Sequence, residues 1–191
     1  EEILRIERDK EGHWPENRLI LVGSDKHTRI ISIQGGSKTG WIIGDPILEK
    51  GKGALIEKYL EESDYSNLLQ TINGHYRMIV WDKRQFSIYI TSSLFGILPV
   101  YYSKNYKTVH ISTDSKSLSA ETGQVQVNKR FFLENILFYY QLFNETAYKN
   151  VRLLPANHGM VISGNGPALH KHTNVSDWFV PNPKPWKKSS G

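Results

Sequence analysis

Cysteine is absent from the 191 residues of this chain. Its absence excludes disulfide bonds, thiolate metal sites and a cysteine nucleophile within these residues. Long apolar runs are also missing: none approaches the ~18 residues of a membrane span, and no charged start followed by an apolar stretch indicates a signal peptide. We therefore expect a cytoplasmic domain with no membrane partner. The chain begins with Glu1 and not Met, which we interpret as a start inside a longer protein.

The composition is that of an ordinary folded domain, with 39% hydrophobic and 23% charged residues. The net charge is +5, but the basic residues are spread along the chain and interleaved with acids. Only Lys184, Lys187 and Lys188 approach a cluster, and they lie in a proline-rich tail. We therefore expect no nucleic-acid partner. The boundaries predicted are one domain over residues 1–178 and a linker over residues 179–191.

Short apolar runs separated by turn residues predict antiparallel strands in the first half of the chain. The period then changes to that of one or two helices between Lys52 and Leu69, interrupted near Ser63-Asp64. A hairpin follows, with its turn at Asp82, and a last strand pair surrounds the turn at residues 164–166. Strands in runs with helices between them indicate an α+β architecture in which helices pack on antiparallel sheets.

The segment from Lys129 to Phe143 has helical spacing, and Asn128 is its predicted N-cap. Aromatic side chains gather in this region. We interpret them as core residues and not as a ligand platform. The set comprises Phe131, Phe132, Phe138, Tyr139, Tyr140 and Phe143.

Four sequence blocks follow one another in order: residues 73–82, 94–102, 112–118 and 151–158. They resemble the glutaminase domain of the asparagine synthetase family, whose motifs read Gly-x-Phe-Ala-Phe-Ala-x-Trp-Asp, Arg-Asp-x-Phe-Gly-x-Lys-Pro-Leu-Tyr-Tyr, Ala-Ser-Glu-x-Lys-Ala-Leu and Val-x-x-Leu-Pro-Pro-Gly-His. The resemblance implies the four-layer αββα sandwich of antiparallel sheets found in N-terminal-nucleophile hydrolases. Most of the matched residues also have a purely structural use, so the fold is implied more firmly than the chemistry.

The resemblance implies a glutaminase that uses an N-terminal cysteine as nucleophile and releases ammonia to a second domain. That chemistry needs a nucleophile, a base and donors for the developing oxyanion. The family alignment places the nucleophile near Glu2, and neither Ser nor Thr occurs before Ser24. The family's Arg-Asp pair before the second block is replaced by Ser92-Ser93. We therefore predict no catalytic residue in this chain.

The same alignment locates a vestigial substrate pocket. The family's oxyanion asparagine corresponds to Ile43, which has no polar side chain, and the connection from Gly44 to Gly74 is too short for the family's Ser-Asp element. Arg18 could correspond to the arginine that holds the substrate carboxylate, although a surface arginine at a strand start is the favoured explanation. The pocket residues predicted are Arg18, Ile43, Gly44, Asp45, Asn73 and Gly74.

Other polar residues are weaker candidates. His170 and His172 share one strand face and could form the edge of a metal site, but without a third ligand we expect exposed histidines and no metal. Asp82 at a hairpin turn and Asp114 near a helix start are explained by local hydrogen bonds.

Three functions remain open. The first is a degenerate, inactive glutaminase-like domain that serves as a structural or docking partner of a synthetase-type domain in the same polypeptide. The second is a true glutamine amidotransferase domain whose cysteine precedes Glu1. The third is a free-standing module that binds a ligand in the vestigial pocket. We expect no cofactor in this chain, since ATP and Mg would belong to a downstream asparagine-synthase-like ligase domain. A homodimer is compatible with the sequence.

Overall fold

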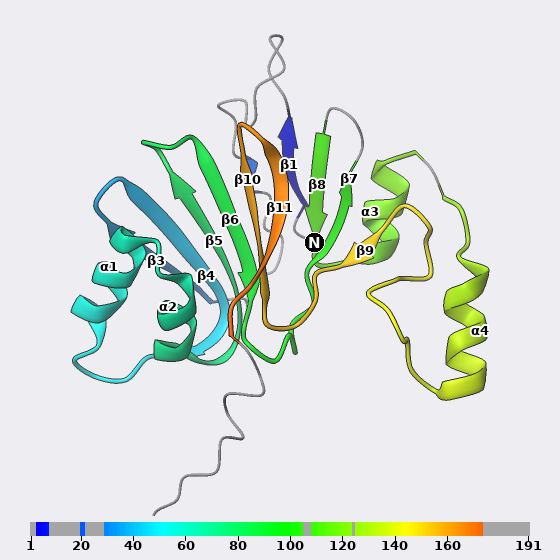
Figure 1. Cartoon of the computed structure of the whole chain (residues 1–191), viewed down its shortest axis with the longest axis horizontal. Coiled ribbons are helices and arrows are strands. Elements are labelled where there is room, and N and C mark those ends of the chain that lie inside the picture. Colours follow the sequence, from blue (N-terminus) through cyan, green and yellow to red (C-terminus); the bar gives the residue numbers. More distant parts are fainter. Residues whose placement is uncertain (1–2, 8–19, 22–28, 105–107, 124, 174–191) are drawn as a thin grey trace, which may run out of the picture.

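The computed structural model describes residues 3–7, 20–21, 29–104, 108–123 and 125–173. In these residues the strands form two antiparallel sheets, shown in Figure 1. The six-stranded sheet has the order β11-β10-β6-β5-β4-β3, and its strands are β3 (Ile30–Gly35), β4 (Lys38–Ile47), β5 (Asn73–Asp82), β6 (Ser87–Ser92), β10 (His158–Ser163) and β11 (Gly166–Lys171). The five-stranded sheet has the order β2-β1-β8-β7-β9, and its strands are β1 (Ile3–Glu7), β2 (Ile20–Leu21), β7 (Tyr101–Lys104), β8 (Thr108–Ser112) and β9 (Arg152–Leu153).

One apolar core joins the two sheets. The six-stranded sheet contributes Ile43, Ile79 and Met160, among others, and β8 contributes Val109 and Ile111. Alternate residues of each strand point to opposite faces of a sheet. The neighbours of these core residues along β4 and β5 therefore point to the other face of the six-stranded sheet, where helices cover them.

Helices close both outer faces. Helices α1 (Gly53–Glu62) and α2 (Tyr65–Thr71) cover the six-stranded sheet, burying Leu60 and Leu68 against Ile42 and Met78. On the opposite side, α3 (Ser115–Glu121) packs against β7 and β8 (Figure 1). The layers are thus helix, sheet, sheet and helix, which confirms the predicted α+β, four-layer αββα fold.

Local hydrogen bonds explain where the helices and turns begin. Ser63 adopts a left-handed conformation that ends α1, and the Asp64 side chain then accepts from the backbone N–H of Asn67 to start α2. Asp114 caps α3 in the same way, and Asp82 accepts from two backbone N–H groups in the hairpin turn. The predicted helix break and both structural interpretations of these aspartates are confirmed.

Helix α4 (Lys129–Phe138) departs from the prediction. The aromatic residues of this region are not core: Phe132 is 46% exposed and Tyr139 is 92% exposed. Asn128 occupies the predicted N-cap position, but its side chain makes no capping hydrogen bond and donates instead to Glu145 and to the Thr146 carbonyl. Helical spacing shows that one face of a helix is apolar. It does not show whether that face is covered by the same chain. None of the helices that the structure describes is long and apolar enough to cross a bilayer.

Candidate functional site

The predicted pocket residues of β4 and β5 are brought together by the pairing of these two strands. Asp45 lies opposite His75, and Pro46 lies opposite Gly74. Asp45 and Asn73 are exposed. Arg18 lies outside the described residues. The alignment therefore selected one contiguous region of the fold, with Arg18 left as a prediction.

Two glycines allow β4 and β5 to approach at this point. Gly44 has φ 126° and Gly74 has φ 94°, a range that side chains disfavour. A Cβ atom at Gly44 would lie 2.6 Å from the carbonyl oxygen of His75, and one at Gly74 would collide with the carbonyl oxygen of Asp45. Both positions thus require glycine for the fold, independently of any chemistry.

Hydrogen-bond donors are lacking at the position of the family's oxyanion asparagine. Ile43 is 2% exposed and belongs to the core between the sheets. The next donor along the chain is the backbone N–H of Gly44, and it already donates to the carbonyl of Arg29 at 2.9 Å. Neither residue therefore offers a free donor to a developing oxyanion.

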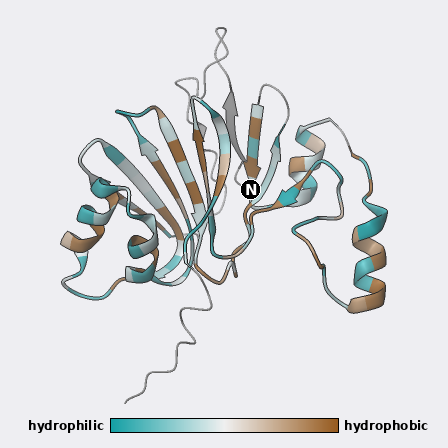
Figure 2. Ribbon diagram, in the orientation of Figure 1, coloured by the Kyte–Doolittle hydropathy of each residue, from teal (hydrophilic) through white to brown (hydrophobic). Residues whose placement is uncertain are grey.

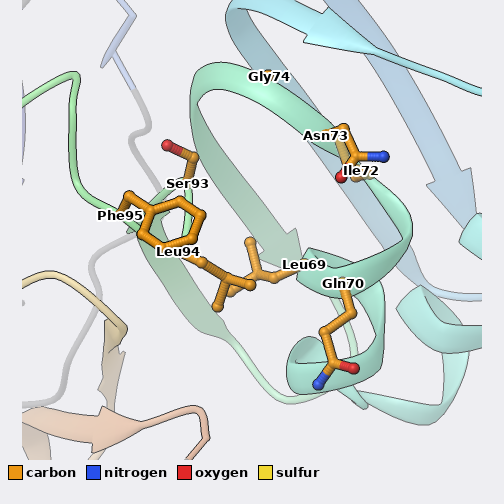
Figure 3. A pocket seen from close by; sticks show the side chains of 8 residues that line it. All are labelled: Leu69, Gln70, Ile72, Asn73, Gly74, Ser93, Leu94 and Phe95. Atoms are coloured by element: carbon orange, nitrogen blue, oxygen red, sulfur yellow. The ribbon is translucent and has the colours of Figure 1, made fainter. Parts of the chain in front are cut away.

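A pocket of about 410 Å³ lies beside the start of β5, as Figure 3 shows. It includes Asn73 and Gly74 of the predicted site, whereas Ile43, Gly44 and Asp45 are not among its described lining residues. The end of α2 and the loop after β6 supply the rest. None of the described lining residues carries a charge; they are Leu69, Gln70, Ile72, Asn73, Gly74, Ser93, Leu94 and Phe95.

The described lining supplies no charged partner for a free amino acid as ligand. Such a ligand carries a carboxylate and an ammonium group, and their transfer from water needs charged partners or several hydrogen bonds. The described part of this pocket offers polar atoms only from amide side chains, one serine and the backbone.

Ser93 is a pocket residue that the sequence analysis did not assign, although the change from Arg-Asp to Ser92-Ser93 drew attention to it. It is 5% exposed, and its Oγ has no hydrogen-bond partner among the described residues. Its backbone is fixed, because its N–H donates to the Tyr76 carbonyl and its carbonyl accepts from Gly96, both at 2.8 Å. A serine nucleophile needs a base within hydrogen-bond reach. The part of the chain that the structure describes places no such base beside Ser93.

The two histidines of β11 and its end have different surroundings. His170 is exposed, as predicted. The expectation of exposure is wrong for His172, which is half-buried with its Nε2 atom 2.9 Å from the Tyr89 hydroxyl. Burial lowers the pKa of His172 to about 4, so the ring is neutral at pH 7. No group of three or more His, Cys, Asp or Glu residues suited to a metal ion occurs in the described ranges.

Comparisons with known proteins identify the family of the domain. A family model for a glutamine amidotransferase domain matches residues 54–173. No curated protein matches the chain. Among solved structures, the chain is similar to glutamine phosphoribosylpyrophosphate (PRPP) amidotransferase from B. subtilis, complexed with ADP and GMP, with 9% identity and a TM-score of 0.41. That match covers 81% of this chain and 31% of the amidotransferase, so the chain spans about a third of its length. Because the family model matches well over half of the residues, the chain belongs to the glutamine amidotransferase domain family.

Proposed function

We propose that this domain does not hydrolyse glutamine and serves as a structural docking domain for an ATP-dependent synthetase-type domain of the same polypeptide. The observation that carries the proposal is Ile43, a buried core residue at the position where the alignment requires the oxyanion asparagine. Removing one such donor costs a glutaminase-type reaction roughly 3 kcal/mol of barrier lowering. In this proposal the side chain at position 43 stabilises the core between the sheets and no longer stabilises a developing oxyanion.

Three further observations support the loss of activity. The N–H of Gly44 is already engaged by the Arg29 carbonyl. The described lining of the neighbouring pocket holds no charged group for the carboxylate or ammonium of glutamine. Cysteine occurs nowhere in the 191 residues.

Asparagine synthetase parentage is supported by the four ordered blocks and by how the fold uses them. The first block is β5, the second runs from the loop after β6 into β7, the third joins β8 to α3, and the fourth joins β9 to β10. The second and fourth blocks are in contact, since a Cβ atom at Gly96 would lie 3.1 Å from that of Ala156. In this proposal ATP and Mg are bound by the synthetase-type domain and not by this one, and the protein is cytoplasmic.

A glutaminase assay on the full-length protein tests the loss of activity. We expect glutamate formation no faster than with the heat-denatured protein, and no covalent labelling by an electrophilic glutamine analogue in intact-mass spectra. A cysteine-dependent glutaminase serves as the positive control. Specific turnover, or a label on a cysteine upstream of Glu1, would establish the true amidotransferase instead.

The docking role has a separate test. Deleting residues 1–178 from the full-length protein should lower the thermal unfolding midpoint of the remaining synthetase-type domain, because the interface that covers it is lost. An unchanged midpoint would refute docking while leaving the glutaminase result intact. It would favour a role for this domain that does not depend on the synthetase-type domain, such as ligand binding in the vestigial pocket.

A further inference from the structure

The surface around α4 is the largest group of exposed apolar side chains in the described structure. We call residues 125–143 the α4 arm; it stands to one side of the two sheets in Figure 1. Four helical positions form a stripe spaced so that they share one face. Their exposed fractions are 46% for Phe132, 56% for Leu133, 74% for Ile136 and 59% for Leu137. Hydrophobic residues recur along the helix in Figure 2.

The polar side of α4 is the side that is covered. Glu134 is the one buried residue of the helix. Its carboxylate accepts from Arg130 Nε at 2.7 Å and from the backbone N–H of Leu142 at 3.1 Å. The Arg130 guanidinium also lies 4.3 Å from the centre of the Phe143 ring. The segment after the helix thus folds back over Glu134 and leaves the apolar stripe exposed, which is the reverse of a helix whose apolar face meets its own core.

The base of the arm is fixed to the domain. The backbone N–H of Asn128 donates to the carbonyl of Ala147 at 2.8 Å, and its side chain donates to Glu145 at 2.8 Å. Glu145 in turn pairs with Arg152 of β9 at 2.9 Å. Buried Thr146 donates to the Val151 carbonyl at 3.0 Å. The base of the arm is therefore anchored beside β9.

The amount and the chemistry of this surface fit an interface between identical chains. Large apolar side chains of the arm are 44% to 92% exposed and together offer on the order of 800 Å², which is the share of one partner in a standard interface. The stripe supplies part of this area, and monomers rarely expose contiguous apolar patches larger than a few hundred Å². Interfaces between identical subunits are the more apolar class, whereas contacts between domains of one chain are more polar.

We infer that the stripe formed by Phe132, Leu133, Ile136 and Leu137 packs antiparallel against the same stripe of a second copy of this chain. Residues four apart form the ridges that interlock in the commonest class of helix packing. A twofold axis brings identical patches together, so one apolar stripe suffices for both sides.

Charge also favours the antiparallel arrangement. Helix α4 begins with Lys129 and Arg130, has no acidic residue in its first turn and has no basic residue in its last turn. Basic residues at the start of a helix oppose its dipole. In an antiparallel pair, exposed Lys129 lies beside the carbonyl end of the partner helix, where a cation is favourable. The inference concerns a surface separate from the pocket and stands whether or not the domain hydrolyses glutamine.

Light scattering coupled to size exclusion tests the inference on the 191-residue chain. We expect twice the single-chain mass of 22.0 kDa at micromolar concentration. Leu137→Glu should raise the dissociation constant by roughly 100-fold or more, because it buries a charge within the interface. Leu55→Glu is the matched control, since Leu55 is a helical leucine 40% exposed on α1, and it should leave the dimer intact.

A second variant keeps the result independent of folding defects. Because the chain has no cysteine, Ile136→Cys introduces a single thiol. We expect mild oxidation to give a disulfide-linked dimer for Ile136→Cys and not for Leu55→Cys. A monomeric wild-type chain, or a dimer that survives Leu137→Glu, would overturn the inference. The first outcome would assign the stripe to a different partner, such as a synthetase-type domain.

Discussion

His172 connects distant parts of the fold through its side chain and its backbone. Its ring meets Tyr89 of β6, its backbone carbonyl accepts from Ser66 of α2 at 2.8 Å, and its N–H donates to the carbonyl of Asn157. The end of β11 is thereby joined to the helical layer. A neutral ring can accept a hydrogen bond at Nε2 from the Tyr89 hydroxyl, and burial keeps the ring neutral by lowering the pKa of His172 to about 4.

The low pKa of His172 predicts a specific acid sensitivity. A histidine in the unfolded chain binds a proton near pH 6.5, whereas folded His172 does so only near pH 4. Its contribution to stability is therefore complete above about pH 6.5 and is lost as the pH falls towards 4. Urea midpoints at pH 7 and pH 4.5 should differ less in His172→Gln than in the wild type. His170→Gln, at an exposed position, should keep the wild-type difference; equal pH dependence in both variants would contradict the assignment.

Asp82 neutralises a buried lysine and holds a turn. Lys38 and Asp82 are both buried, with Nζ and Oδ2 3.9 Å apart, and Oδ1 accepts from the Ser37 hydroxyl at 3.0 Å. Asp82→Ala leaves the ammonium unpaired, so we expect a loss of about 3 kcal/mol in the free energy of unfolding. Glu62→Ala, which removes the exposed partner of Lys58, should cost less than about 0.5 kcal/mol. Equal losses in chemical denaturation would show that burial of the Asp82 pair is unimportant.

At the scale of elements, the pairing of β4 with β5 determines the geometry of the candidate site. The two strands remain paired from Lys38 and Asp82 to Ile47 and Asn73. Gly44 lies within this ladder with φ 126°, at the point where the alignment locates the vestigial pocket. This backbone conformation requires glycine whether or not catalytic side chains are present.

Gly44→Ala should therefore destabilise the domain. The new methyl group would lie 2.6 Å from the carbonyl oxygen of His75 in a conformation that side chains disfavour. We expect a loss of about 3 kcal/mol, measured by urea unfolding. Gly53→Ala is the control, because Gly53 opens α1 and a Cβ atom there meets nothing within 4 Å. The free energy of unfolding of that variant should lie within about 0.5 kcal/mol of the wild-type value. If both variants lose the same free energy of unfolding, the steric explanation is wrong.

Sequence patterns predicted the elements where local chemistry decides them. The helix break at Ser63-Asp64 and the turn at Asp82 follow from side chains that bond to nearby backbone, and both were identified. The α4 arm was misjudged because helical spacing reports that a face is apolar, not what covers it. Ser93 lines the pocket because the loop after β6 lies beside the end of α2. This is a long-range contact that no local sequence pattern encodes.

At the scale of the whole molecule, Ile43 lies at the junction of the two sheets. Its neighbours in the inter-sheet core come from both, including Ile79 of β5 and Ile111 of β8. An asparagine here would need a hydrogen-bond partner among apolar side chains. The alignment assigns a polar catalytic group to this position, but the two sheets pack here around the apolar side chain of Ile43.

Restoring the family residue should consequently damage the fold. We expect Ile43→Asn to lower the free energy of unfolding by about 3 kcal/mol, because it leaves a void and an unpaired amide in the core. Ile30→Asn is a matched control on the paired strand, where Ile30 lies opposite Ile43 but is 56% exposed. It should cost less than about 1 kcal/mol. If thermal melts show that Ile43→Asn is tolerated as well as Ile30→Asn, the position has kept room for a polar group.

The order of strands in the five-stranded sheet also bears on how the chain folds during synthesis. Strand β1 lies between β2 and β8, and its first residue, Ile3, pairs with Ser112. So large a separation along the chain makes this pairing slow to form. A nascent chain must keep β1 unpaired on its β8 side until β8 has left the ribosome. Translation that stops before β8 would therefore leave β1 with a bare edge, the kind of surface on which strands of other chains add.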